Sequence, residues 1–253
     1  MSNSGPTAIE EAVRICETAA EAGITVRLAG GLAIQYLTPE FPARGGDSQD
    51  LDLATASSDR RPLTEFLGGR GYVADKTFNA LYGHKQLYFQ STETGRSVDV
   101  LVDRLHMCHT VEFAGRLGRM PVTLDLTDLL LSKLQIVELN EKDAQDILYL
   151  CSAYPVSDGD KPGTIGLDRI RPIVGNDWGW WRTATLNLDR ITELASGDGQ
   201  RLVPEGGQHR AVEQLGVLRT AMETVPKSLR WKARARVGER VRWYEVPEET
   251  PHQ

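Results

Sequence analysis

The stretch 27–55 restricts the fold of this chain more than any other, because it joins a glycine pair to two acids at strand spacing. Its hydrophobic pattern predicts two short strands that are separated by a tight turn, a helix and an irregular loop. The predicted strand, turn, helix and second strand are Thr25–Ala29, Gly30-Gly31, Leu32–Tyr36 and Asp50–Thr55. Since side chains alternate along a strand, the carboxylates of Asp50 and Asp52 should point to the same side of a sheet.

Two carboxylates that lie close together suit a divalent cation. Like charges at short range resist ionising together unless a cation lies between them. Carboxylate oxygens are ligands of Mg²⁺, which usually also keeps waters and substrate phosphates. At the glycine pair, Gly30 and Gly31, a phosphate can approach bare backbone N–H groups at the start of a helix. Together these features predict a unit that binds Mg²⁺ and a nucleoside triphosphate.

A third acid lies in a predicted hairpin. Lys85–Gln90 and Ser97–Val102 have the composition of two strands joined by a polar turn, and Asp99 stands between two valines of the second. A lone acid is costly if it is buried without a partner. The spacing leaves two interpretations open: Asp99 lies on a solvent face, or it joins Asp50 and Asp52 as a third carboxylate that binds metal or accepts the proton of an attacking hydroxyl.

Two further helices are predicted downstream. Leu126–Leu139 has helical spacing of apolar residues and contains Lys133. Glu141–Tyr154 carries Asp143 and Asp146 three residues apart, on one helix face. From spacing alone, a solvated lysine and two surface acids are favoured over a functional cluster.

The order of the predicted elements indicates a fold class. An N-terminal helix should begin at a capping box formed by Thr7 and Glu10. Strands and helices then mix in an α/β (α+β) pattern, which predicts a mixed β-sheet core flanked by helices. Pro155–Thr164 is rich in Gly, Pro, Asp and Ser and is typical of a linker. We therefore expect a first domain over 1–154 and a mainly helical C-terminal region over 155–253.

The C-terminal region contains a strongly basic segment. Lys227–Arg242 holds seven basic residues and one acid, with Trp231 inside it and Trp243 just after it. A basic helix with interleaved aromatic residues can follow the phosphate backbone of RNA. An ordinary solvated helix face is the other interpretation. Three upstream tryptophans, Trp178, Trp180 and Trp181, are expected to pack in a core or in a seam between the two halves of the chain. A base-stacking platform is the less favoured interpretation.

Composition excludes several classes of protein. The net charge of −6 over 253 residues is mild, so the average surface does not indicate nucleic-acid binding. Cys16, Cys108 and Cys151 are odd in number and far apart, which indicates reduced core thiols rather than a disulfide framework. The sequence contains no long apolar run and no signal-peptide pattern, so we expect a cytoplasmic protein.

The sequence His106-Met-Cys108-His109 contains possible zinc ligands. A structural zinc site needs four ligands, and no second ligand pair follows at finger spacing. We therefore interpret this segment as a helix end with a core cysteine and polar histidines.

The ordered set of motifs resembles the polymerase-beta-type nucleotidyltransferase superfamily. GGLAIQYL, then Arg44, then DSQDLDL resembles the opening of the AbiEii-type nucleotidyltransferases, the toxin halves of bacterial toxin–antitoxin pairs. That group includes mycobacterial enzymes that add nucleotides to tRNA 3′ ends. The later block DLLLSKLQIVELNEKDAQDILYL resembles the lysine helix and acid-pair helix of the family. The resemblance covers about residues 25–150.

The resemblance implies a role for each matched residue. The triphosphate would lie on Gly30, Gly31, Arg44, Ser48 and Lys133. The metal would be bound by the three acids Asp50, Asp52 and Asp99, and the acceptor oriented or deprotonated by Asp143 or Asp146. Two departures stand out: Gly31 replaces the more common serine, and Glu141 with Lys142 stands where the family usually has an arginine. The segment between the glycines and the acids is also longer than usual.

These features favour a magnesium-dependent enzyme that moves a nucleoside monophosphate from a triphosphate, such as ATP, to an acceptor hydroxyl. The first expectation is an RNA acceptor such as tRNA, bound through Lys227–Arg242, in a toxin-like setting with a cognate antitoxin. The mild acidity is equally compatible with a small cationic acceptor such as an aminoglycoside. A third possibility is a nucleotide-binding module without catalysis.

Overall fold

The structure is a computed structural model that describes residues 6–42, 50–197, 203 and 207–247. Its internal contacts divide the chain into two units. The first unit comprises Met1–Leu105 and Glu112–Asp125, and the second comprises His106–Val111 and Leu126–Gln253. We describe each unit by itself.

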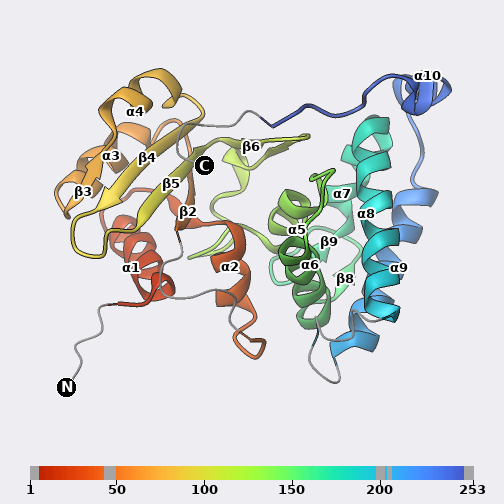
Figure 1. Ribbon diagram of the computed structural model, residues 1–253, viewed down its shortest axis with the longest axis horizontal. Helices are drawn as coiled ribbons and strands as arrows, with labels where there is room; N and C mark the ends of the chain where they lie inside the picture. The colour runs from red at the N-terminus through yellow and green to blue at the C-terminus, as the bar shows by residue number, and fades with distance from the viewer. Residues whose placement is uncertain (1–5, 43–49, 198–202, 204–206, 248–253) are drawn as a thin grey trace. The chain divides into compact units, whose positions relative to one another are not determined.

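A five-stranded mixed sheet forms the centre of the first unit (Figure 1). Its order is β1-β2-β5-β4-β3, and only β2 and β5 run parallel. The strands are β1 (Val26–Leu28), β2 (Leu51–Thr55), β3 (Tyr72–Ala74), β4 (Gln86–Ser91) and β5 (Ser97–Val102). The α/β fold class with a mixed sheet is therefore confirmed, as is the hairpin of β4 and β5.

The two faces of the sheet differ in polarity because side chains alternate along each strand. One face is apolar and buried, with Leu53, Phe89 and Val100 fully enclosed. The other face carries Asp52 and Asp99. A one-residue slip of either central strand would move an acid into the core, so the hydrophobic pattern fixes the register.

Four helices accompany the sheet in the first unit: α1 (Ala8–Glu21), α2 (Gly30–Leu37), α3 (Arg60–Gly68) and α4 (Lys76–Tyr82). α1 packs against β1 and β2 and begins with the predicted capping box of Thr7 and Glu10. α2 starts at Gly30, two residues before the predicted start, so the glycine pair lies in the first helical turn. A short 3₁₀ helix spans Ala114–Arg116.

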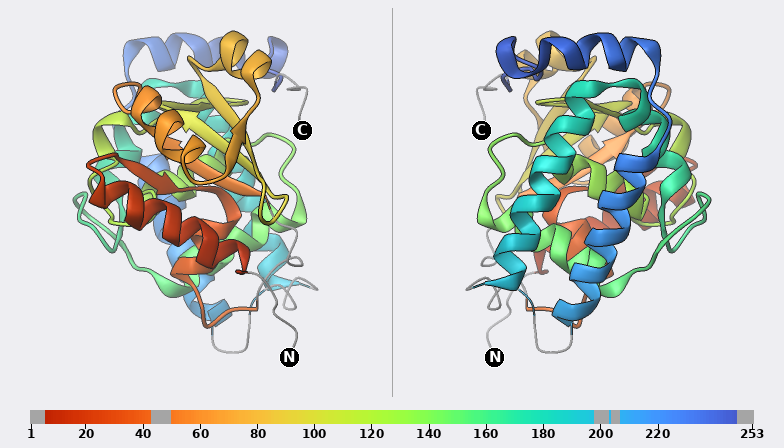
Figure 2. Two further views of the ribbon diagram at one scale, coloured as in Figure 1. Left: turned by 90° about the vertical axis from the view of Figure 1, so that its left-hand side faces the viewer. Right: turned by 90° about the vertical axis from the view of Figure 1, so that its right-hand side faces the viewer.

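The second unit is mainly helical, as predicted for the C-terminal region (Figure 1). α8 and α9 lie side by side, and α9 also packs against α6 (Figure 2). The helices are α5 (Leu126–Leu134), α6 (Glu141–Ala153), α7 (Leu167–Asn176), α8 (Trp178–Ser196), α9 (Gly207–Thr224) and α10 (Leu229–Val237). The short strands β8 (Val156–Ser157) and β9 (Ile165–Gly166) pair in parallel. A 3₁₀ turn, Gly238–Arg240, follows α10.

Two elements differ from the sequence-based expectation. The segment predicted as a helix end is a two-stranded sheet of β6 (Arg104–His106) and β7 (Thr110–Glu112), so that prediction is wrong. The division into units falls near Asp125, so α5 and α6 belong with the C-terminal helices by their contacts. The predicted domain boundary at 154–155 stays a prediction.

Other expectations from composition can be compared directly. All three cysteines are buried with free thiols, and burial raises the pKa of Cys16 and of Cys151 to about 12. These thiols are core residues, as predicted. None of the helices in the described ranges combines the length and apolar character that crossing a membrane requires.

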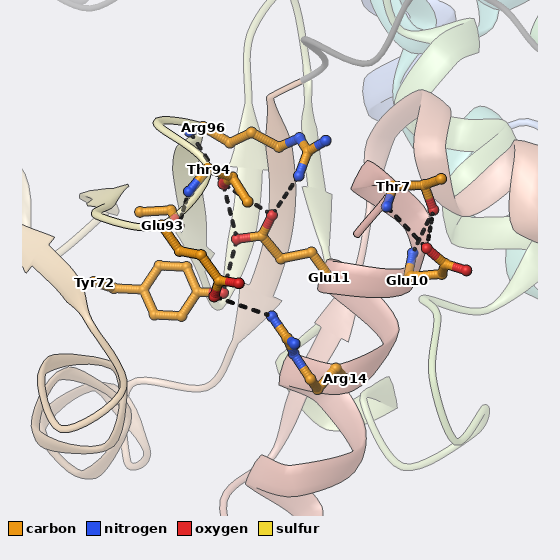
Figure 3. A network of polar contacts seen from close by, with 9 residues as sticks. Thr7, Glu10, Glu11, Arg14, Tyr72, Glu93, Thr94 and Arg96 are labelled. Atoms are coloured by element: carbon orange, nitrogen blue, oxygen red, sulfur yellow. Dashed lines mark hydrogen bonds and ion pairs between the residues drawn. The ribbon is translucent and has the colours of Figure 1, made fainter. Parts of the chain in front are cut away.

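A buried ion pair ties α1 to the turn between β4 and β5, and a hydrogen bond ties the same carboxylate to β3 (Figure 3). The carboxylate of Glu11, 1% exposed, accepts hydrogen bonds from Arg96 at 2.7 Å, Tyr72 at 2.9 Å and Thr94 at 3.0 Å. Burial alone would raise the pKa of Glu11. The hydrogen bonds from these three partners lower the pKa by more than burial raises it, so the net pKa lies below its ordinary value of 4.5. Folding therefore favours the ionised form of this carboxylate.

We predict that Glu11→Gln lowers the free energy of unfolding by about 3–5 kcal/mol at pH 7, because Arg96 is left buried without its charge partner. The pKa of Glu11 is lower in the folded protein than in the unfolded chain. The ionised carboxylate therefore stabilises the fold at pH values above the unfolded-state pKa, and this stabilisation is lost as the pH falls through the folded-state pKa. Urea unfolding between pH 7 and pH 3 should therefore show the difference from wild type shrinking in acid. Glu17→Gln, at an exposed position of the same helix, is the control. A constant difference across this pH range would contradict the account.

Candidate active site

Two of the three predicted acids are neighbours on the central parallel strands. Strands β2 and β5 are neighbours in the sheet (Figure 1). Asp52 of β2 and Asp99 of β5 are direct register partners. Their side chains share the polar face of the sheet, because the residues on either side of each point into the core. Of the two interpretations of Asp99, the structure supports its position beside Asp52.

The predicted glycine turn lies against the same carboxylate. Gly30 has φ +61°, a conformation that L side chains rarely adopt. A Cβ at this position would lie 2.2 Å from Oδ2 of Asp52, so no other residue fits without displacing the carboxylate. The backbone N–H of Ala29 also donates to the carbonyl of Asp52 at 2.8 Å. The start of α2 is therefore fixed directly beside Asp52.

Residues of β4 hold Asp99 from its other side. The side-chain amide of Gln86 donates to Oδ1 of Asp99 at 2.5 Å. Tyr88 is the register partner of Asp99, and its hydroxyl lies 2.9 Å from the hydroxyl of Ser97. The sequence analysis did not identify Gln86 as a site residue. Its place in the hairpin, two residues before the tyrosine opposite Asp99, is the signal that could have found it.

Asp50 lies immediately before β2 and is exposed. Among the described residues, no group of three or more His, Cys, Asp or Glu side chains is arranged to hold a metal ion. The structure thus presents Asp52 and Asp99 as a pair, and the participation of Asp50 stays a prediction. Mg²⁺ is commonly held by one or two carboxylates together with substrate phosphates. The oxygen donors of the Asp52–Asp99 pair fit that pattern, and the missing Cβ of Gly30 lets the Asp52 carboxylate lie against the start of α2.

The N-terminus of α2 is a second functional feature beside the pair. The first N–H groups of a helix have no acceptor within the helix. The N-cap residue Ala29 provides no side-chain hydrogen bond to them, so these donors can bind an anion. The predicted triphosphate residues Arg44 and Ser48 lie outside the described residues.

The predicted Lys133, Asp143 and Asp146 form a cluster within the second unit. Nζ of Lys133 lies 2.8 Å from Oδ1 of Asp143 and 3.1 Å from Oδ2 of Asp146. Burial lowers the pKa of Lys133, but Asp146 and Asp143 raise it more, so the net pKa lies above its ordinary value. The lysine is therefore held in its charged form. The surface interpretation of these residues is wrong, because all three are largely enclosed.

The possible zinc ligands are used in other ways. His106 bridges Glu245 at 2.8 Å and Thr110 at 2.7 Å. Cys108 is buried and accepts a hydrogen bond from the backbone N–H of Val137 at 3.5 Å. These contacts agree with the expectation of a core cysteine and of a polar His106. His109, by contrast, is buried, with Nε2 2.8 Å from the hydroxyl of Thr183.

Comparisons with known proteins give weak similarities only. No protein-family model matches the chain, and no curated protein matches it. An antigenic nucleotidyltransferase-like protein from Paracoccidioides brasiliensis is similar in structure, with 13% identity and a TM-score of 0.37 over 87% of this chain and 94% of that chain. A STING-associated CdnE c-di-GMP synthase from Capnocytophaga granulosa has 12% identity and a TM-score of 0.25 over 85% of this chain and 86% of that chain.

At these TM-scores we base no argument on either similarity. Neither structure is of the AbiEii type by its description. The AbiEii-type resemblance therefore stays a prediction from the sequence motifs, and the site geometry is what supports a function.

We predict that Gly30→Ala destabilises the first unit by more than backbone strain alone. A positive φ costs a non-glycine residue about 1–2 kcal/mol, and the new Cβ must also displace the Asp52 carboxylate. Gly95→Ala is a matched control, because Gly95 has φ +72° and open space around it. Urea unfolding should show the larger loss for Gly30→Ala. Equal losses in the two variants would contradict the close approach of Gly30 to Asp52.

Proposed function

We propose that the protein is a nucleotidyltransferase that moves a nucleoside monophosphate from a nucleoside triphosphate to an acceptor hydroxyl. The observation that carries the proposal is the register pairing of Asp52 with Asp99 beside Gly30 at the start of α2. A pair of carboxylates next to free helix N–H groups combines a cation site with a phosphate site. Both are needed to bind a metal–triphosphate complex.

In this proposal the Asp52–Asp99 pair would hold Mg²⁺, with Asp50 as an additional ligand. The ion, when bound, neutralises charge on the phosphoryl oxygens and on the leaving pyrophosphate. The backbone N–H groups at the start of α2 would hold the phosphates, since the N-cap residue Ala29 gives them no side-chain hydrogen bond. Catalysis would then come mainly from positioning and electrostatics.

The reaction forms one bond and breaks one bond. The acceptor oxygen bonds to the α-phosphorus, and the bond from that phosphorus to the bridging oxygen of pyrophosphate breaks. In this proposal Asp99, whose Oδ1 accepts a hydrogen bond from Gln86 at 2.5 Å, would also take the proton of the attacking hydroxyl. The expected roles of Lys133 on phosphate, and of Asp143 or Asp146 on the acceptor, remain part of the proposal.

RNA is the acceptor that we propose first. The support is the basic segment Lys227–Arg242, whose helix α10 buries none of its residues. Arg230, Lys232 and Arg236 of this helix are exposed, so these cationic side chains are available to bind an anionic partner. A toxin-like role and a cognate antitoxin stay predictions from the resemblance.

We predict that Asp52→Asn and Asp99→Asn stay folded and each reduce turnover by about 100-fold or more, the scale of removing one preorganised charge-stabilising group. Release of pyrophosphate from the four nucleoside triphosphates with Mg²⁺ is the measurement, with bulk tRNA or an aminoglycoside mixture as acceptor. Glu65→Gln is the control, because Glu65 is exposed on α3 and pairs only locally with Arg61.

The outcomes separate the candidate functions. Labelled nucleotide on RNA supports the RNA acceptor, and label on the small molecule alone would overturn that part. Tight triphosphate binding without turnover on either acceptor would replace the enzyme by a binding module. Near-normal turnover in Asp52→Asn would overturn the proposed role of the pair.

A further inference from the structure

The second unit contains a cavity of about 860 Å³ that lies apart in sequence from the carboxylate pair. Its wall is formed by the second half of α7, the start of α8, α10 and the segment that follows α10. The segment 108–110 completes it. Four aromatic residues line it: Trp178, Trp180, Trp243 and Tyr244. The first two are nearly enclosed and form the packed part of the wall, whereas the last two are half-buried. The cavity therefore presents aromatic surface that a ligand can reach.

Arginines from two segments face the same cavity. Arg230 and Arg234 lie one helical turn apart on α10, and Arg242 follows the helix. Arg234 has a structural role, since it donates to the carbonyls of Gly238 and Val241 at 2.7 Å each. Arg230 and Arg242 are exposed and form no ion pair with another described residue. Two charged guanidinium groups are thus available beside the aromatic wall.

The two acids that line the cavity are already engaged within the second unit. Asp177 caps α8 by accepting the N–H of Trp180 at 3.1 Å, and Glu245 pairs with His106 at 2.8 Å. Burial lowers the pKa of His109 to about 4, against the raising effects of Asp177 and Glu245, so this histidine is neutral at pH 7. The cation excess at the cavity therefore comes from the arginines.

Charge on the surrounding helix extends this positive surface. Lys227–Arg242 carries a net charge of +6, whereas the whole chain carries −6, so the remainder carries −12. Lys232 and Arg236 project from the side of α10 opposite to Arg230, because they lie two and six residues further along the helix. Concentrated cations in an acidic chain attract a polyanion rather than a single small anion.

Stacking and charge occur side by side at the cavity edge. The guanidinium of Arg242 lies 5.8 Å from the ring centre of Tyr244. Trp243 is fixed in place, since its ring N–H donates to Oγ1 of Thr183 at 3.0 Å. Aromatic rings beside cations are the feature by which proteins bind single-stranded nucleic acid, since bases stack on rings while phosphates pair with Arg or Lys. An acidic protein partner would pair with the cationic side chains, but it has no bases to stack on the aromatic rings of the cavity.

We propose that this cavity binds one nucleotide unit of a single-stranded nucleic acid. The phosphate would pair with Arg230 and Arg242, the base would stack against Tyr244, and neighbouring phosphates would follow the cations of α10. The inference concerns residues of the second unit only and does not depend on catalysis by Asp52 and Asp99. If the strand is RNA, its binding here would supply an acceptor for the proposed function.

The experiment measures binding of a fluorescein-labelled RNA of about 12 nucleotides, within the usual span of such sites, by anisotropy at several salt concentrations. We expect Arg230→Ala/Arg242→Ala to weaken binding about 10-fold or more. The slope of log affinity against log salt should fall in magnitude by about 1.4, since two phosphate contacts of a single strand are lost. Arg190→Ala/Arg210→Ala removes two exposed arginines outside the cavity and serves as the control for total charge.

Two further variants test stacking and independence. Tyr244→Ala should weaken binding, whereas Tyr244→Phe should restore it because the ring is kept. Asp52→Asn should bind the RNA as wild type does, which separates this inference from the proposed function. Equal losses in the two double-arginine variants would overturn the proposal. Three other results would also overturn the proposal. They are tighter binding to duplex RNA than to the single strand, an affinity for free AMP equal to that for the RNA, and binding to an acidic protein without binding to the RNA.

Discussion

The structure of the first unit depends on one constraint: two acids must lie side by side on a pair of parallel strands. Asp52 and Asp99 are level with each other because β2 and β5 run parallel in register. Leu51, Leu53 and the valines of β5 point to the opposite face and are buried. Their burial prevents a slip that would relieve the repulsion, since every side chain would then change faces. The energy for keeping the acids together thus comes from the apolar side of the same strands.

Cationic side chains of the second unit lie in two contrasting environments. Lys133 is enclosed with two carboxylates 2.8 and 3.1 Å away, so its charge is balanced internally. Arg230 and Arg242 are exposed at a cavity edge, and the acids beside them are occupied by other partners. The first arrangement stabilises a helix pair, whereas the second leaves positive charge for a ligand. The difference lies in which groups surround each cation, and charge counts along the sequence do not reveal it.

Local patterns predicted much of the fold because they are local in origin. The capping box at Thr7 and the alternation in β4 and β5 appear directly in the sequence and are confirmed. The end of α5 was predicted too late, at Leu139. The helix ends at Leu134, where Asn187 of α8 donates to the carbonyls of Leu134 and Ile136. That contact joins residues more than 50 positions apart and leaves no local signal.

The sequence predicted the glycine pair and the acids of the candidate site, but it did not predict how they are arranged. The glycine pair and Asp52 belong to one short stretch, so their proximity follows from strand and turn spacing. Asp99 lies beside Asp52 because β2 pairs in parallel with β5. This pairing joins strands far apart in the sequence, and the alternation of polar and apolar residues around Asp99 does not say which strand β5 pairs with. Gln86 was missed for the same reason, since its contact with Asp99 exists only once the hairpin joins the sheet. Strand β3 has only three residues, too few for a visible alternation.

The most direct test of the carboxylate pair is metal binding. Titration of the protein with Mn²⁺, followed by electron paramagnetic resonance with a non-hydrolysable triphosphate analogue present, measures the ion independently of turnover. We predict that wild type and Glu65→Gln bind Mn²⁺ alike and that Asp52→Asn and Asp99→Asn each weaken binding by about 10-fold or more, the scale on which lost metal-site partners act. Unchanged Mn²⁺ affinity in both aspartate variants would contradict the account.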